Sequence, residues 1–86
     1  MDVNQLIKII NVKIKKNIKC EDIKIIDKTY LHKMHSTHQH GKYHFYITIK
    51  SNDLKKLSKI ESFKKVHKIL DKELDQHIHS LQLNIV

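Results

Sequence analysis

The stretch YHFYITIK at residues 43–50 alternates strictly between two kinds of side chain and decides the fold class. One set of alternate positions holds Tyr43, Phe45, Ile47 and Ile49, and the other holds His44, Tyr46, Thr48 and Lys50. Successive side chains of a strand point to opposite faces of its sheet, so one face of this strand is apolar. The stretch is therefore predicted to be the best-formed strand of a sheet that is covered on one side.

Residues 22–27 and about 77–85 also alternate and are predicted to be the two other strands. The first is short, with Ile23 and Ile25 separated by Lys24. In the second, regular alternation places His79 on one side with Leu81, Leu83 and Ile85, and leaves Ile78, Ser80, Gln82 and Asn84 on the other.

Two segments have apolar residues at helical spacing. The first runs from Val3 to about Ile14 with Asp2 as its N-cap, and the second runs from Ser58 to about Asp75. Ser58 followed by Glu61 forms a capping box. The order α-β-β-α-β joins the first two strands as an antiparallel hairpin and requires a crossover helix before a parallel third strand. We predict an α/β (α+β) fold with a mixed three-stranded sheet and helices on one face, as one domain over residues 1–86.

Composition narrows the class of protein. The net charge is +8 and all seventeen basic residues are lysines, so the arginine fork that reads phosphates and guanines is absent. The single cysteine, Cys20, excludes an internal disulfide and a metal cage of cysteines alone. No apolar run approaches the ~18 residues that span a bilayer, and the N-terminus lacks a signal-peptide pattern, so a cytoplasmic protein without membrane contact is expected.

Histidines are concentrated in one segment. Residues 28–42 follow neither period and are predicted to be a long hairpin loop, and within or beside this loop lie His32, His35, His38, His40 and His44. Neutral imidazole binds zinc, iron and copper, so a metal site is chemically available, although a solvated loop that binds nothing has the same composition. His77 and His79, one strand repeat apart, are predicted to share a face and to form the second half of such a site, the alternative being structural histidines at a strand end.

The order of these residues resembles the BolA family. DKTYLH at residues 27–32, GKYHF at 41–45 and the strand that ends in Ser51 are similar to the family's D-(E/D)-S-x-x-H, G-x-x-H-F and apolar strand ending in Ser. LDKEL at 70–74 and IHSL at 78–81 are similar to its L-x-x-E-L and (I/V)-H-A-L. The chain departs from the family at residues 54–56, where F-x-G is usual, and at 62–64, where R-H-R is usual.

The resemblance implies a fold like the type II KH domain and a non-enzymatic accessory role in iron–sulfur cluster assembly. It further implies that the chain, monomeric alone, forms a heterodimer with a monothiol glutaredoxin around a shared [2Fe–2S] cluster that is not tightly bound by the isolated protein. His79 and His32 would be the ligands, with His35 as an alternative to His32. The glutaredoxin cysteine and glutathione would hold the other iron. Weaker ligand candidates are His38, His40 and His77.

Two other functions are compatible with the sequence. DNA binding, a role attributed to some BolA relatives, would use lysines such as Lys64, Lys65 and Lys68, but a KH-type G-x-x-G clamp is absent because Gly41 is the single glycine. A histidine-rich zinc-binding protein would use the loop alone. An enzyme is not expected, because the sequence has no evident nucleophile beside a base and no open zinc motif.

Overall fold

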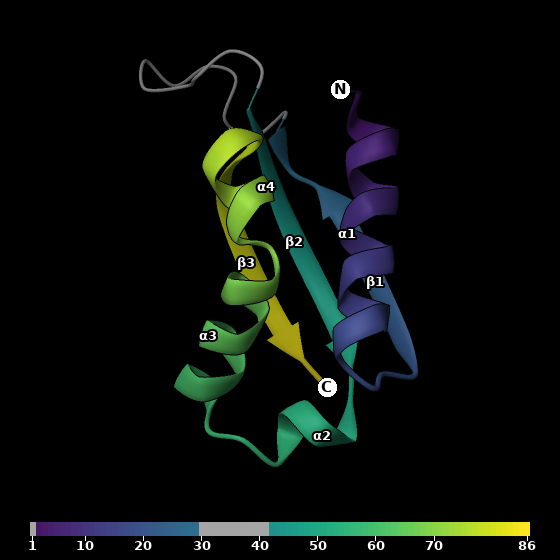
Figure 1. The fold of residues 1–86 in the computed structure, drawn as a ribbon, viewed down its shortest axis with the longest axis vertical. Coiled ribbons are helices and arrows are strands. Elements are labelled where there is room, and N and C mark those ends of the chain that lie inside the picture. The colour runs from purple at the N-terminus through teal and green to yellow at the C-terminus, as the bar shows by residue number, and fades with distance from the viewer. Residues whose placement is uncertain (1, 30–41) are drawn as a thin grey trace.

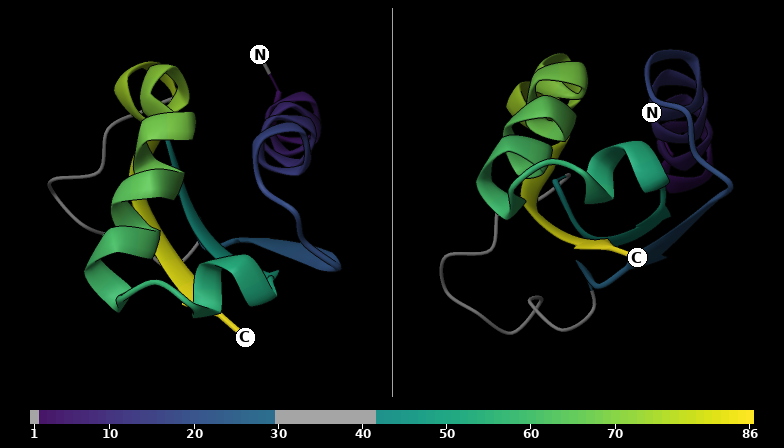
Figure 2. Two further views of the ribbon diagram at one scale, coloured as in Figure 1. Left: turned by 60° about the horizontal axis from the view of Figure 1, so that its bottom comes forward. Right: turned by 90° about the horizontal axis from the view of Figure 1, so that it is seen from below.

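The computed structural model describes residues 2–29 and 42–86. Its elements in chain order are α1 (Val3–Asn17), β1 (Asp22–Asp27), β2 (Tyr43–Lys50), α2 (Asn52–Lys55), α3 (Lys59–Ile69), α4 (Asp71–Gln76) and β3 (Ile78–Ile85). The strands form one sheet in the order β1-β2-β3, in which β1 is antiparallel and β3 parallel to β2. The helices lie on one face of this sheet (Figures 1 and 2). The predicted fold class is confirmed.

The apolar face of β2 forms one side of the hydrophobic core. Phe45, Ile47 and Ile49 are at most 1% exposed, and Leu6, Ile10 and Ile14 of α1 belong to the same buried cluster. Complete burial of one such side chain stabilises the fold by about 1.5–3 kcal/mol. The strict alternation of residues 43–50 therefore correctly predicts which face of the central strand packs against the core.

The first helix begins where predicted and ends one turn later. Asp2 Oδ1 accepts a hydrogen bond of 2.8 Å from the Gln5 N–H, and the Gln5 side chain accepts one of 3.2 Å from the Asp2 N–H. The helix continues past Ile14 to Asn17, because Lys15 and Lys16 are good helix formers although they add nothing to the apolar pattern.

The sequence predicted one continuous second helix, but the structure has two, α3 and α4. Ser58 Oγ accepts from the Glu61 N–H at 3.1 Å and caps α3 as expected, but the helix breaks at Leu70, whose φ of −99° and ψ of 18° are not helical. Leu70 is fully buried and keeps the helical spacing of the apolar residues, so periodicity alone does not reveal the break.

A further short helix, α2, was not expected from the sequence. Ser51 initiates it: its Oγ accepts from the Leu54 N–H at 3.2 Å and donates to the Lys19 carbonyl oxygen at 2.7 Å. Because Ser51 is buried, both of these bonds lie within the protein. The same side chain thus caps α2 and ties it to the connection between α1 and β1.

One ion pair joins the two sides of the helical layer. Lys13 Nζ of α1 lies 2.6 Å from Glu73 Oε2 of α4, and the Glu73 side chain is 7% exposed. The break at Leu70 starts the short helix that carries Glu73.

None of the helices in residues 2–29 and 42–86 has the length and apolar character that crossing a membrane requires.

Candidate functional site

A bulge at the start of β3 determines where His79 points. Tyr43 of β2 pairs with Ile78, but the next residue, His44, pairs with Ser80, so His79 is the extra residue of the ladder. Ile78 is consequently 2% exposed in the core, whereas His79 is exposed. Bulges re-aim side chains and are common beside functional sites. The predicted faces of Ile78 and His79 are therefore wrong, since they assumed a regular ladder.

His44 lies directly beside the bulge. Its ring is buried, with 4% exposure, and its Nδ1 lies 2.6 Å from Ser80 Oγ. The centroid of the same ring lies 4.8 Å from that of His79, with 53° between the ring planes. The buried His44 ring is thus hydrogen-bonded to Ser80 and packs against the exposed ring of His79.

The residues before the histidine-rich segment are fixed to the same place. Asp27 Oδ1 accepts hydrogen bonds from the Thr29 N–H, at 2.9 Å, and from the Thr29 hydroxyl. Thr29 Oγ1 in turn accepts from the His44 N–H at 3.1 Å, and the His44 carbonyl oxygen accepts from the Lys28 N–H at 2.7 Å. Residues 27–29 are therefore anchored to the start of β2 at His44.

The prediction that His77 shares a strand face with His79 is wrong. It is the C-cap of α4, its N–H donates to the Glu73 carbonyl oxygen at 2.8 Å, and β3 begins only at the next residue. The His77 carbonyl oxygen accepts from the Tyr43 N–H at 2.9 Å. The short α4 extends one residue further than the predicted helix end at Asp75, and this removes His77 from the strand.

The loop histidines of the prediction, His32, His35, His38 and His40, lie outside the described residues. Over the two described ranges, no group of three or more His, Cys, Asp or Glu side chains is arranged to hold a metal ion. The described part of the chain therefore offers one exposed imidazole at this site, His79, backed by the buried ring of His44.

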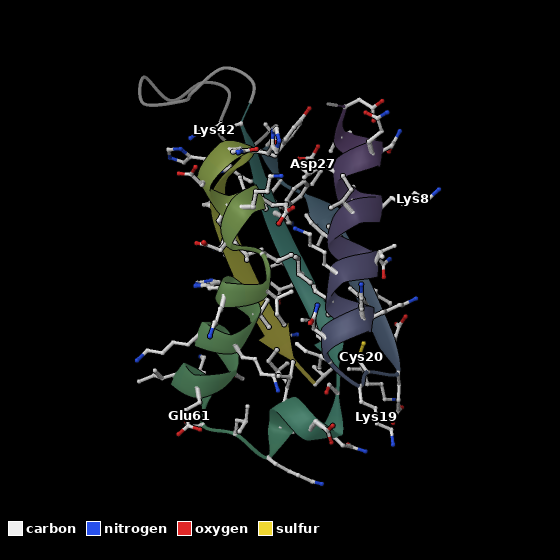
Figure 3. The ribbon with its side chains drawn as sticks, viewed as in Figure 1. Lys8, Lys19, Cys20, Asp27, Lys42 and Glu61 are labelled. Carbon is white, nitrogen blue, oxygen red and sulfur yellow. The ribbon has the colours of Figure 1, made fainter. Side chains whose placement is uncertain are left out.

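Cys20 lies at the opposite end of the sheet from this site. Figure 3 shows Asp27 and Lys42 at one end of the molecule and Cys20 with Lys19 at the other. Cys20 is half-buried. Burial raises the pKa of Cys20, with Asp22 acting in the same direction and Lys15 opposing it, so the thiol form is favoured. This cysteine does not contribute to the histidine site.

The remaining predicted residues, Lys64, Lys65 and Lys68, are on α3, and all three are exposed. Sequence reasoning did not assign a site role to His44, Thr29 or Ser80. The G-x-x-H-F motif and the position of His44 on the polar side of the strand were the available signals. The bulge that brings Ser80 opposite His44 has no such signal.

Comparisons with known proteins agree on one family. The sequence matches the family model described as BolA-like protein over residues 14–86. The fold is similar to the BolA domain of SufE1 from Arabidopsis thaliana, with 20% identity over 99% of this chain and 92% of that one and a TM-score of 0.77. It is also similar to BolA1 from the same plant, with 22% identity over 91% and 86% of the two chains and a TM-score of 0.76.

A third similar structure is the mouse (Mus musculus) BolA1 protein, with 19% identity over 90% of this chain and 60% of that one and a TM-score of 0.72. The search of curated proteins found no significant match. At these identities, the structural neighbours show that the fold is shared.

Proposed function

We propose, since the chain belongs to the BolA-like family, that it is a non-enzymatic accessory protein of iron–sulfur cluster assembly or trafficking. In this proposal it shares a [2Fe–2S] cluster with a monothiol glutaredoxin and is monomeric without that partner. The observation that supports it best is the exposed His79 on the bulge, with its ring against the buried, hydrogen-bonded ring of His44.

The chemistry of this donor fits a shared cluster better than a cluster held by this chain alone. Two histidines on one iron give a stable [2Fe–2S] centre with a raised potential, as in Rieske proteins. At this site the described residues present one exposed imidazole, that of His79, and His32 or His35 would be the second ligand. The glutaredoxin cysteine and glutathione would ligate the other iron, and the bound cluster would supply electron-transfer and cluster-transfer chemistry.

The surroundings of His79 bear on how it would act as a ligand. Metal-bound imidazoles are usually oriented by neighbouring groups. Here the bulge turns the side chain outward, and the His44 ring limits the rotamers that His79 can adopt. The lysine-rich surface, with a net charge of +8, would favour docking to an acidic partner.

Anaerobic cluster reconstitution with a monothiol glutaredoxin and glutathione tests the proposal. Visible circular dichroism is expected to show a heterodimer spectrum for the wild type that is lost in His79→Ala. His77→Ala is the matched control, because His77 is a nearby histidine whose hydrogen bonds with Glu73 and Tyr43 are made by its backbone. No complex with wild type, or an unchanged spectrum for His79→Ala, would overturn the proposal.

DNA binding is a second candidate, favoured by the three exposed lysines Lys64, Lys65 and Lys68 along α3. Binding of this kind weakens steeply with added salt, with a logarithmic slope of about −0.9 for each phosphate that the protein neutralises. Replacing the three lysines by glutamine should reduce the slope by roughly 2–3 if they bind phosphates. An unchanged slope of affinity against salt would exclude this use of α3.

Metal binding by the loop histidines alone, the other alternative function, would persist in His79→Ala.

A further inference from the structure

β3 is an edge strand of the described sheet, and it carries no charge. The sheet order β1-β2-β3 leaves the outer side of β3 without a strand partner among the described residues. No Lys, Asp or Glu occurs from Gln76 to Val86, although 30% of the chain is charged. Natural proteins guard exposed edges with charges, and the other edge strand, β1, carries Asp22, Lys24 and Asp27. The edge of β3 therefore lacks the protection that β1 has.

A groove lies along the C-terminal half of this strand. Its volume is about 390 Å³, and it lies between β3 on one side and α2 and the start of α3 on the other. Figures 1 and 2 show α2 beside the end of β3. The apolar lining is made by Leu54, Leu57, Phe63, Leu83 and Ile85. Leu83 and Ile85 are on the core side of the sheet but only half-buried, so the helices leave this part of β3 incompletely covered.

The charges at the groove have one sign. Lys55 and Lys59 line it, both are exposed, and no carboxylate is among the described residues that line it. Lys59 Nζ lies 5.8 Å from the centre of the Phe63 ring, so its ammonium group is held near the apolar lining. This arrangement favours an occupant with negative charge next to apolar side chains.

The charge also decides between possible protein occupants. A second copy of this chain, paired edge to edge, would carry its own net charge of +8. It would also bring its own Lys55 and Lys59 along with its β3. A segment with carboxylates instead meets both lysines favourably.

We infer that an extended acidic segment of a partner protein adds to the free edge of β3. Its backbone continues the sheet, one of its apolar side chains fills the groove, and its carboxylates lie at Lys55 and Lys59. This is the β-strand addition mode, in which main-chain hydrogen bonds give affinity and a pocket gives specificity. The groove lies about 17 Å along the strand from His79, at ~3.3 Å per residue, so this surface is separate from the proposed ligand site.

Selection of displayed random octapeptides on the immobilised full chain tests the inference without assuming a partner. A parallel selection uses the double variant Lys55→Glu/Lys59→Glu, and Lys15→Glu/Lys16→Glu at the exposed end of α1 is the matched control. We expect peptides that alternate acidic and apolar residues to be enriched on the wild type and the control. Their affinity for the Lys55→Glu/Lys59→Glu variant should be roughly tenfold lower.

Amide hydrogen exchange then locates the bound peptide. The selected peptide should slow exchange of β3 amides in residues 81–85, and a version with alternate backbone N-methyl groups should not bind, because it cannot pair with a strand edge. No enrichment, protection elsewhere, or equal binding of the methylated peptide overturns the inference. Tighter binding of a single-stranded oligonucleotide to the same amides would assign the groove to nucleic acid and also overturn it.

Discussion

His44 on β2 and Ser80 on β3 are joined across the sheet by a contact of 2.6 Å between Nδ1 and Oγ. This contact lies at the bulge, immediately beside the exposed His79. It holds the residue that follows His79 and places the His44 ring against the His79 ring. The orientation of the proposed ligand therefore depends on two other side chains, the buried His44 and the half-buried Ser80.

Replacing Ser80 by alanine should change the proposed cluster site more than the fold. The variant loses one hydrogen bond, which lowers the free energy of unfolding by about 1 kcal/mol. We expect a shifted visible circular dichroism spectrum of the heterodimer, because the His79 ring is less restricted. Ser80→Thr keeps the hydroxyl and should retain the wild-type spectrum. A wild-type spectrum for Ser80→Ala would show that this hydrogen bond does not orient His79.

Thr29 links the start of β2 to the residues before the histidine-rich segment. Thr29→Val removes the oxygen that accepts from the His44 N–H and leaves this donor unsatisfied, so the free energy of unfolding should fall by about 1–3 kcal/mol. Thr29→Ser keeps both hydrogen bonds of the hydroxyl and is the matched control. Urea denaturation measures both variants. Equal stability of the two would contradict the role assigned to the hydroxyl.

The ion pair between Lys13 and Glu73 should contribute to stability, because Glu73 is buried. Lys13→Met keeps the aliphatic length but leaves the carboxylate without its hydrogen-bond donor and cation, at a cost of about 1–3 kcal/mol in the free energy of unfolding. Lys16→Met, on the exposed end of the same helix, should change it by less than ~0.5 kcal/mol. If the two variants are equally stable in urea, the pair does not join α1 to α4 energetically.

The raised pKa of Cys20 predicts slow alkylation at neutral pH. Only the thiolate reacts, and burial disfavours it, so the rate should rise with pH through a midpoint higher than that of a free cysteine amide. The reaction with iodoacetamide between pH 7 and pH 11 measures this midpoint. A midpoint at or below that of the free amide would show that the thiol is activated rather than shielded.

Periodicity predicts much of this fold but not its irregularities. The strand at residues 43–50 and the capping residues Asp2 and Ser58 follow from side-chain alternation and hydrogen-bonding chemistry, and the structure confirms them. The break at Leu70 and the bulge at His79 do not, because both residues continue a regular pattern in the sequence. Tertiary packing determines them, through the burial of Leu70 and of Ile78.

The candidate site was predictable only in part for the same reason. His79 was recognised from its motif, but its exposure comes from the bulge and its neighbour His44 from pairing across the sheet. The pairing of His77 with His79 was wrong, because α4 extends to Gln76 and places His77 at a helix end. The roles of His32 and His35 remain predictions.

Pulsed electron paramagnetic resonance of the reduced heterodimer tests the central claim, that His79 is a cluster ligand, most directly. The sample combines this chain, with isotopically labelled histidine nitrogens, with unlabelled glutaredoxin and glutathione. We predict hyperfine coupling from labelled nitrogen in the wild type and in His77→Ala, and loss of one coupled nitrogen in His79→Ala. The same couplings in His79→Ala as in the wild type, or none in the wild type, would contradict the claim.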